Sequence, residues 1–193
     1  MANAGARPSE WLVPALAIVG AVTAWRVGML ALARIDLFVD EAQYWFWGQQ
    51  LAFGYYSKPP LIGWVIRAST EIGGSDAAFW VRLPGPLFHA ASALVLGWIA
   101  AERYGRGPAI WVAATYVTLP MVTVASVLIS TDTVMFPFLA AALGFWLRSL
   151  DRGGSTRDAI LAGGLAGIAF LGKYAAVYLP LCAGLAALVL PQA

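Results

Sequence analysis

Two adjacent carboxylates, Asp40 and Glu41, stand among aromatic residues in the stretch VDEAQYWFW and are the first candidates for chemistry. A carboxylate packed among aromatic rings is partly desolvated, which raises its pKa and makes it a stronger base. Such a group could deprotonate an acceptor hydroxyl or amine. The pair could also hold a divalent cation, although two acids alone make an incomplete metal site. Equally, both could be solvated charges at a helix start, because neighbouring side chains point in different directions.

Three cations could meet a phosphate. Lys58 in YYSKPPL precedes two prolines, which hold the chain extended and fix the position of the charge. A fixed ammonium group suits a phosphate oxygen and can stabilise a phosphate leaving group, although it could also snorkel to lipid headgroups. Arg82 in VRLPGP could pair with a loop carboxylate or a phosphate. Lys173 in FLGKYAAVY could mark a helix end or make a second phosphate contact.

A third acid, Asp132, lies in LISTDTVMF at the end of an apolar segment. Either Ser130 or Asp132 could cap the next helix, but an ionisable residue at such a depth is also a candidate for a functional site. The single histidine, His89, offers no metal-ligand cluster, and we expect a buried imidazole with its hydrogen bonds satisfied. No cofactor is predicted with certainty.

The composition indicates where these residues must work. The chain of 193 residues is 61% hydrophobic and only 11% charged, and its mean hydropathy is +0.74. Soluble domains are about 45–50% apolar and about 25% charged. We therefore expect a polytopic helical membrane protein surrounded by lipids. The net charge of +2 and the lack of a basic run give no reason to expect nucleic acid as a partner.

Apolar segments predict six spans, since about 20 apolar residues cross a bilayer. They cover residues 11–33, 84–101, 108–129, 134–147, 159–171 and 175–190, and the fifth could be only a partial span. The first could also be a signal peptide, but its length favours a retained helix. Residues 34–82 are polar and rich in aromatic residues, which are typical of a membrane interface. We expect a folded loop there with one or two short helices along the membrane surface.

Arginines in the short loops predict the orientation. Arg103 and Arg106 lie in one such loop, and Arg148, Arg152 and Arg157 lie in another. Short loops rich in arginine stay in the cytoplasm. The N-terminus is therefore predicted to be cytoplasmic, and the loop of residues 34–82 is predicted to lie on the outer face together with the acid that precedes the fourth span.

Five motifs occur in an order that resembles the family-39-type glycosyltransferases, which include protein O-mannosyltransferases and lipid A aminoarabinose transferases. They are VDEAQYWFW, GYYSKPPLIGWV, VRLPG, STDTVMF and GLAGIAFLGKYAAVYLP, and the resemblance covers residues 34–190. It implies an all-α bundle of GT-C architecture whose first external loop carries juxtamembrane helices. It also implies a sugar donor carried on polyprenyl phosphate and a lipid, glycan or protein acceptor. The reaction would take place on the periplasmic side of a bacterial inner (plasma) membrane.

The same resemblance implies roles for the candidate residues. Asp40 would be the base, assisted or oriented by Glu41, Asp132 would be a second acid, and Lys58 would hold the phosphate leaving group. The reaction would be one inverting displacement at the anomeric carbon. Members of this family are longer, so we expect the chain to be the N-terminal part of such an enzyme. Two other hypotheses stay open: a transporter or lipid-binding subunit without catalysis, and an inactive fragment of the transferase.

Overall fold

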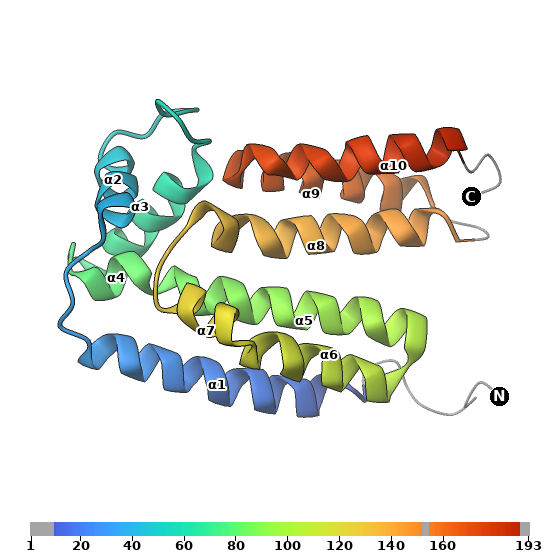
Figure 1. Ribbon diagram of the computed structural model, residues 1–193, viewed down its shortest axis with the longest axis horizontal. Coiled ribbons are helices and arrows are strands. Elements are labelled where there is room, and N and C mark those ends of the chain that lie inside the picture. Colours follow the sequence, from blue (N-terminus) through green and yellow to red (C-terminus); the bar gives the residue numbers. More distant parts are fainter. Residues whose placement is uncertain (1–9, 152–154, 190–193) are drawn as a thin grey trace.

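The computed structural model describes residues 10–151 and 155–189, and in these residues it contains helices and no strand (Figure 1). This confirms the predicted all-α class. The long helices run along one common axis in Figure 1. They are α1 (Leu12–Leu32), α5 (Pro84–Tyr104), α6 (Arg106–Thr118), α8 (Thr131–Ser149), α9 (Thr156–Gly172) and α10 (Tyr178–Val189).

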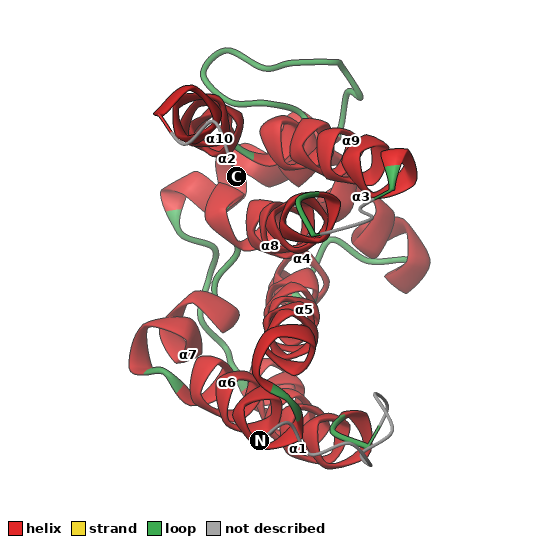
Figure 2. Ribbon diagram, turned by 90° about the vertical axis from the view of Figure 1, so that its right-hand side faces the viewer, coloured by secondary structure: helices red, strands yellow, loops and turns green. Residues whose placement is uncertain are grey.

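The helix α5 lies in the middle of the bundle, as the end-on view in Figure 2 shows. It packs against α1 and α6 on one side and against α8 on the other, and α8 in turn packs against α9. Small residues line the contact of α5 with α6, among them Ala93 and Ala100 opposite Ala109 and Ala113. Small side chains allow helix axes to approach closely, which is how helices associate in a membrane.

The helix surfaces fit an integral membrane protein. Large apolar side chains such as Val13, Trp25 and Leu32 of α1 are exposed. Within the described residues, Leu12–Leu32 and Ala78–Tyr104 are each long and apolar enough to cross a membrane, and α6 together with the next helix could make a third span. Helices α8 and α9 cover the fourth and fifth predicted spans, and α10 covers residues 178–189 of the sixth, whose last residue lies outside the described residues. These spans stay predictions.

The third predicted span, residues 108–129, is not one continuous helix. It divides into α6 and α7 (Pro120–Ser126), and the two are bent by 59°. Proline disfavours a helical conformation in the residue before it, and Leu119 is accordingly extended, with φ −56° and ψ 134°. The prediction of a span over these residues did not anticipate the break at Pro120.

Arg26 of α1 fills the gap that this break opens. Its guanidinium group donates to the Val117 carbonyl oxygen, to Thr123 Oγ1 at 2.8 Å and to Ser126 Oγ at 3.0 Å. Backbone groups released by a helix break inside a membrane need a partner within the protein. Arg26 supplies one, and the sequence analysis did not foresee this role.

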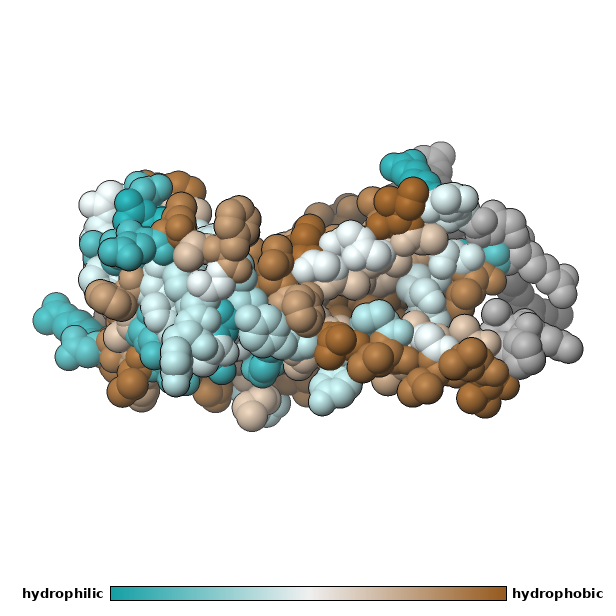
Figure 3. Space-filling model, turned by 90° about the horizontal axis from the view of Figure 1, so that it is seen from above, coloured by the Kyte–Doolittle hydropathy of each residue, from teal (hydrophilic) through white to brown (hydrophobic). Residues whose placement is uncertain are grey.

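Three short helices gather at one end of the bundle, which we call the loop end. They are α2 (Val39–Gly48), α3 (Leu61–Gly73) and α4 (Ala78–Arg82), one more than the one or two expected. Side chains from these helices and from the start of α8 share a buried cluster that includes Tyr44, Ile62 and Val134. Hydrophilic residues gather over the loop end, whereas hydrophobic residues cover much of the remaining surface in Figure 3.

Candidate functional site

The start of α8 presents Asp132 at the loop end. Ser130 is the N-cap of this helix, because its hydroxyl accepts a hydrogen bond from the Thr133 backbone N–H at 3.3 Å. Asp132 is therefore not needed as the cap. Its two carboxylate oxygens instead meet the Lys173 ammonium group at 2.8 and 2.7 Å. Both side chains remain accessible, at 45% for Asp132 and 35% for Lys173.

Lys173 reaches Asp132 because α9 ends close to the first turn of α8. The last residue of α9, Gly172, lies so near α8 that a Cβ atom there would stand 3.1 Å from the Met135 Cα atom. Lys173 then adopts an extended conformation and leads into the short 3₁₀-helix η1 (Tyr174–Val177). Of the two meanings suggested for Lys173, the structure shows the helix end, and the phosphate contact stays a prediction.

Asp40 and Tyr44 lie one turn apart on α2, with Asp40 exposed and Tyr44 buried. Burial raises the pKa of the Tyr44 phenol, and the negative charges of Asp40 and Asp132 raise it further. Two carboxylates that are 92 residues apart in the sequence therefore both raise the pKa of one phenol group. The sequence analysis did not single out Tyr44, although the spacing of four residues from Asp40 places both on one face of a helix.

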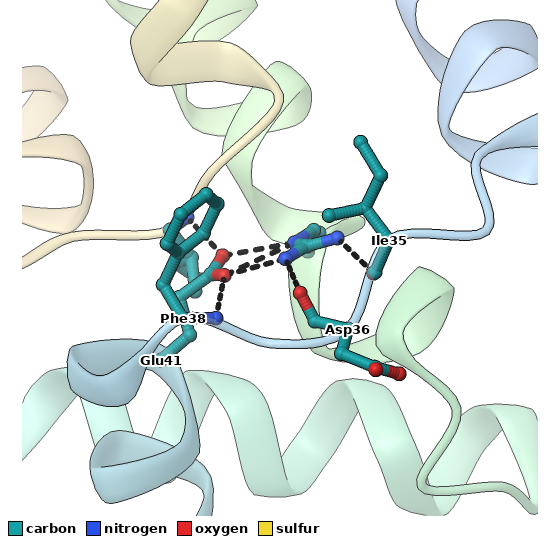
Figure 4. Close-up of polar contacts among 6 residues, drawn as sticks. Ile35, Asp36, Phe38 and Glu41 are labelled. Carbon is teal, nitrogen blue, oxygen red and sulfur yellow. Dashed lines mark hydrogen bonds and ion pairs between the residues drawn. The ribbon is translucent and has the colours of Figure 1, made fainter.

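Glu41 points away from Asp40 and forms a buried ion pair with Arg82. Arg82 Nη2 lies 2.7 Å from Glu41 Oε2, and Arg82 Nε lies 3.0 Å from Oε1. The two carboxylate oxygens also accept the backbone N–H groups of Phe38 at 3.0 Å and Ile129 at 3.1 Å. Arg82 donates in addition to the carbonyl oxygens of Ile35 and Asp36 (Figure 4).

These contacts narrow the roles predicted for Glu41 and Arg82. Both oxygens of Glu41 are occupied, so Glu41 and Asp40 do not converge on one substrate or one cation. Arg82 uses its Nε, Nη1 and Nη2 groups on Glu41 and two carbonyl oxygens. Of the two partners suggested for Arg82, a loop carboxylate and a phosphate, the structure shows the carboxylate. The pair holds together the segment before α2, α4 and the segment before α8.

Lys58 lies half-buried at the loop end, just before α3. Its carbonyl oxygen accepts the Tyr55 backbone N–H at 3.0 Å, and Pro59 and Pro60 after it are fully buried. These contacts hold the backbone on both sides of Lys58, but Pro60 is helical, with φ −81° and ψ −21°, and does not continue the predicted extended segment. None of the ion pairs among residues 10–151 and 155–189 includes Lys58 or Asp40.

His89 is buried within α5, as expected for a satisfied imidazole. Its Nδ1 atom lies 3.1 Å from the Tyr116 hydroxyl, and its Nε2 atom lies 3.4 Å from Thr133 Oγ1. This chain of polar groups links α5 to α6 and to the first turn of α8. No group of three or more His, Cys, Asp or Glu side chains that could hold a metal gathers within the described residues.

The fold and the site define a helical integral membrane protein that brings Asp40, Asp132 and Lys173 together around a buried tyrosine at one end of its bundle. The sequence profile of the dolichyl-phosphate-mannose-protein mannosyltransferase family matches residues 57–193. The chain belongs to this family, whose members have the GT-C type of membrane fold. The family found by comparison thus agrees with the resemblance seen in the five motifs.

A curated relative is similar over most of the chain. The lipid A galacturonosyltransferase RgtD of Rhizobium johnstonii is 48% identical over 178 residues, which are 92% of this chain and 37% of the relative. The chain therefore spans little more than a third of the length of that protein. No solved structure matched the chain.

Proposed function

We propose that the chain carries the donor side of a glycosyltransferase site, which moves a sugar from a polyprenyl-phosphate donor to an acceptor at the outer face of the membrane. The observation that carries the proposal is that Asp40 and Asp132 lie near one phenol, Tyr44, while Asp132 holds Lys173 at the loop end. The name of the similar lipid A galacturonosyltransferase makes a uronic acid donor and a glycolipid acceptor one concrete instance.

The proposed reaction is one displacement with inversion at the anomeric carbon. Asp40, exposed and free of an ion pair in the described chain, accepts the proton of the acceptor hydroxyl as its oxygen forms the new glycosidic bond. The bond from the anomeric carbon to the donor phosphate breaks, and the phosphate leaves with the bonding electrons. Lys58 and Lys173 stabilise the negative charge of this leaving group.

Asp132 has a supporting role in this proposal. Its ion pair holds the Lys173 ammonium group at the loop end, at 2.7 Å, before a donor binds. The pair is only half-buried, so a donor phosphate can reach Lys173 and share it. Asp132 then orients the lysine and the neighbouring phenol rather than acting as a second base.

The opposite end of the bundle supports the proposed orientation. Arg103, Arg106 and Arg148 lie there in exposed ion pairs with Asp151, Glu10 and Glu102. Short segments rich in arginine stay on the cytoplasmic side. The loop end then faces outward, where lipid-borne phosphates and acceptors would meet it.

The test is transfer of labelled sugar by the full-length protein in membranes. Asp40→Asn and Lys58→Ala should each lower the rate by about 100-fold or more, in line with the loss of a general base or of a leaving-group contact. Glu71→Gln is the matched control, because Glu71 is an exposed acid on α3 of the same loop. Wild-type rates in both site variants would rule the proposal out.

The transporter alternative has one feature in its favour, the break between α6 and α7. Transporters bind their substrates at the free backbone groups of such broken helices. Here, however, Arg26 already donates to Val117, Thr123 and Ser126 at the break. The break is therefore filled by the protein itself, and we favour the enzyme.

A further inference from the structure

The segment between α2 and α3 encloses a hollow that the proposed reaction does not use. We call it the aromatic pocket. Its volume is about 310 Å³, within the range of about 300–1,000 Å³ that is common for ligand sites. Its walls include the rings of Phe46, Trp47 and Tyr55 and the amides of Gln49 and Gln50.

The walls of the aromatic pocket are held in place by contacts within the protein. The Tyr55 ring stacks on Trp47 with the ring centres 5.3 Å apart and the planes within 2°. The Tyr55 hydroxyl donates to the Gln50 carbonyl oxygen at 3.2 Å. From the other side, Trp64 Nε1 donates to the Ala52 carbonyl oxygen at 3.0 Å. A site shaped in advance loses less conformational entropy when a ligand binds.

The chemistry of the lining selects a neutral, ring-shaped and polar ligand. No charged side chain lines the pocket among the described residues, which disfavours a phosphate group. A sugar ring presents C–H groups on its faces, which pack on aromatic rings, and hydroxyl groups at its edge. The exposed Gln50 amide offers both a donor and an acceptor for such hydroxyls.

The aromatic pocket and Asp40 of the proposed site are both reached from one face of α2. Asp40, Tyr44 and Trp47 are spaced as i, i+4 and i+7, and the rings of Tyr44 and Trp47 are 5.9 Å apart. Seven residues of helix separate Asp40 from Trp47 by roughly 10 Å, since each residue adds about 1.5 Å. That separation is comparable to the length of a disaccharide.

We propose that the aromatic pocket binds a neutral sugar unit of the acceptor, next to the unit whose hydroxyl group reacts at Asp40. The placement of the reacting unit rests on the function proposed above, whereas binding in the pocket does not need sugar transfer. The acceptor class that follows is a glycan or glycolipid with at least two sugar units. A simple lipid alcohol would leave the pocket empty.

A second hollow beside the same segment has a lining that suits contact with the membrane rather than with a sugar. It measures about 260 Å³ and is lined by Leu51, Ala52, Phe53 and Trp64, with no amide among them. Phe53 and Tyr56 are almost fully exposed, at 91% and 99%. These residues suit the membrane interface, and Tyr56, which lines neither hollow, gives a control on the same segment.

The test measures binding of the soluble disaccharide N,N′-diacetylchitobiose to the full-length protein in nanodiscs by saturation-transfer NMR. Trp47→Leu and Gln50→Ala should each weaken binding by about fivefold or more, as expected for loss of an aromatic contact or a hydrogen bond. Tyr56→Ala should stay within about twofold of the wild type, because its side chain lies outside the pocket. Gln50 is exposed, so its variant keeps the test valid if Trp47→Leu fails to fold.

The outcomes separate this inference from the proposed function. Asp40→Asn should lose transfer but retain disaccharide binding, which supports the pocket independently of catalysis. Disaccharide binding that is absent from the wild type, or equal in the Gln50→Ala and Tyr56→Ala variants, would overturn the inference. Equal losses of stability in Trp47→Leu and Tyr56→Ala in nanodiscs, without any effect on disaccharide binding, would also overturn it and assign the segment to the membrane surface.

Discussion

Two ion pairs at the loop end have the same chemistry and opposite surroundings. The side chains of Arg82 and Glu41 are 4% and 3% exposed, and further backbone groups occupy both of them. Those of Lys173 and Asp132 are 35% and 45% exposed, and among residues 10–151 and 155–189 they bond only to each other. A buried, fully bonded pair can only fix a structure, whereas an exposed pair can exchange partners. The Glu41–Arg82 pair therefore fixes the fold of the loop end, and the Asp132–Lys173 pair is available to contact a substrate there.

The largest effect should come from removing one member of the buried pair. Glu41→Gln leaves the Arg82 guanidinium group without a counter-charge, and such a loss typically costs about 3–5 kcal/mol. We expect the free energy of unfolding in mixed micelles to fall by this amount, together with the yield of folded protein. The double variant Glu41→Met with Arg82→Met should recover part of the loss, because it leaves no unpaired charge.

An exposed pair in the same loop is the control for this prediction. Arg67 and Glu71 on α3 lie 2.6 Å apart, with side chains 34% and 61% exposed. Arg67→Ala should cost at most about 1 kcal/mol, the usual value for a surface ion pair. If Glu41→Gln proved no more harmful than Arg67→Ala, the contrast between the two pairs would fail.

The exposed site pair should show the reverse pattern, a small loss of stability and a large loss of activity. Lys173→Ala should change the free energy of unfolding by about 1 kcal/mol or less. It should raise the KM for the donor by about tenfold or more, because a hydrogen bond to a charged phosphate is worth about 1.5–3 kcal/mol. Transfer assays in which the donor concentration is varied would measure this change.

The variant Asp132→Asn tests whether Asp132 acts by orienting Lys173 or by contacting the substrate itself. It removes the counter-charge but leaves Lys173 able to bind phosphate, so its effect on the donor KM should be smaller than that of Lys173→Ala. An Asp132→Asn variant with the larger effect on the donor KM would mean that the carboxylate, and not the ammonium group, contacts the substrate.

The sequence predicted the members of these pairs and offered a loop carboxylate as one partner of Arg82, but it did not identify which carboxylate. Adjacent residues on a helix must diverge, so Asp40 and Glu41 could be expected to do different things, but the sequence does not say which of them is buried. That depends on Arg82 and on the backbone N–H of Ile129, which are 41 and 88 residues away from Glu41. Long-range contacts of this kind are set by the packing of α4 and α8 rather than by local spacing.

The local sequence was more informative where a single residue type, such as proline, restricts the backbone conformation. A fixed backbone at Lys58 was expected from its two prolines, although the helical conformation of the second proline was not. The end of α6 could have been predicted from Pro120 in the same way. Arg26 could not, because its partners lie on α6 and α7 and come close only in the folded bundle. The position of Tyr44 could have been found from its spacing of four residues from Asp40. Its residue type did not single it out, because it lies in a stretch rich in aromatic residues.

Tyr44→Phe should lower the transfer rate moderately, with little effect on stability. It removes one hydroxyl group and keeps the ring within its buried cluster, so the fold should be preserved. Removal of the hydroxyl group beside the Asp40 and Asp132 carboxylates, counted as the loss of one hydrogen bond of about 1 kcal/mol, should lower the transfer rate by roughly fivefold. Measurement of the rate with both substrates saturating would separate this effect from weaker binding.

The pH dependence of the Tyr44→Phe variant tests the state of the phenol. Burial and two nearby carboxylates raise the pKa of Tyr44 above its ordinary value of 10.0. The phenol is therefore neutral at every pH below about 10, and its contribution to stability is lost only as the pH rises through the raised pKa. The pH–rate profiles of Tyr44→Phe and wild type should run parallel from pH 5 to about 9. A difference in their shapes below pH 9 would show that the phenol titrates there.

Added salt should have the smallest effect on the free energy of unfolding. Its effect should differ between the buried pair and the exposed pair. Exposed charges are screened, since the Debye length falls from about 10 Å at 0.1 M salt to about 3 Å at 1 M, whereas buried charges are screened much less. The wild type should lose a few tenths of a kcal/mol of unfolding free energy over this range, and Lys173→Ala should lose less, because its exposed pair is already absent. The Glu41→Met, Arg82→Met variant should respond to salt as the wild type does. If this double variant instead lost the salt response while Lys173→Ala kept it, the assignment of the two pairs would have to be exchanged.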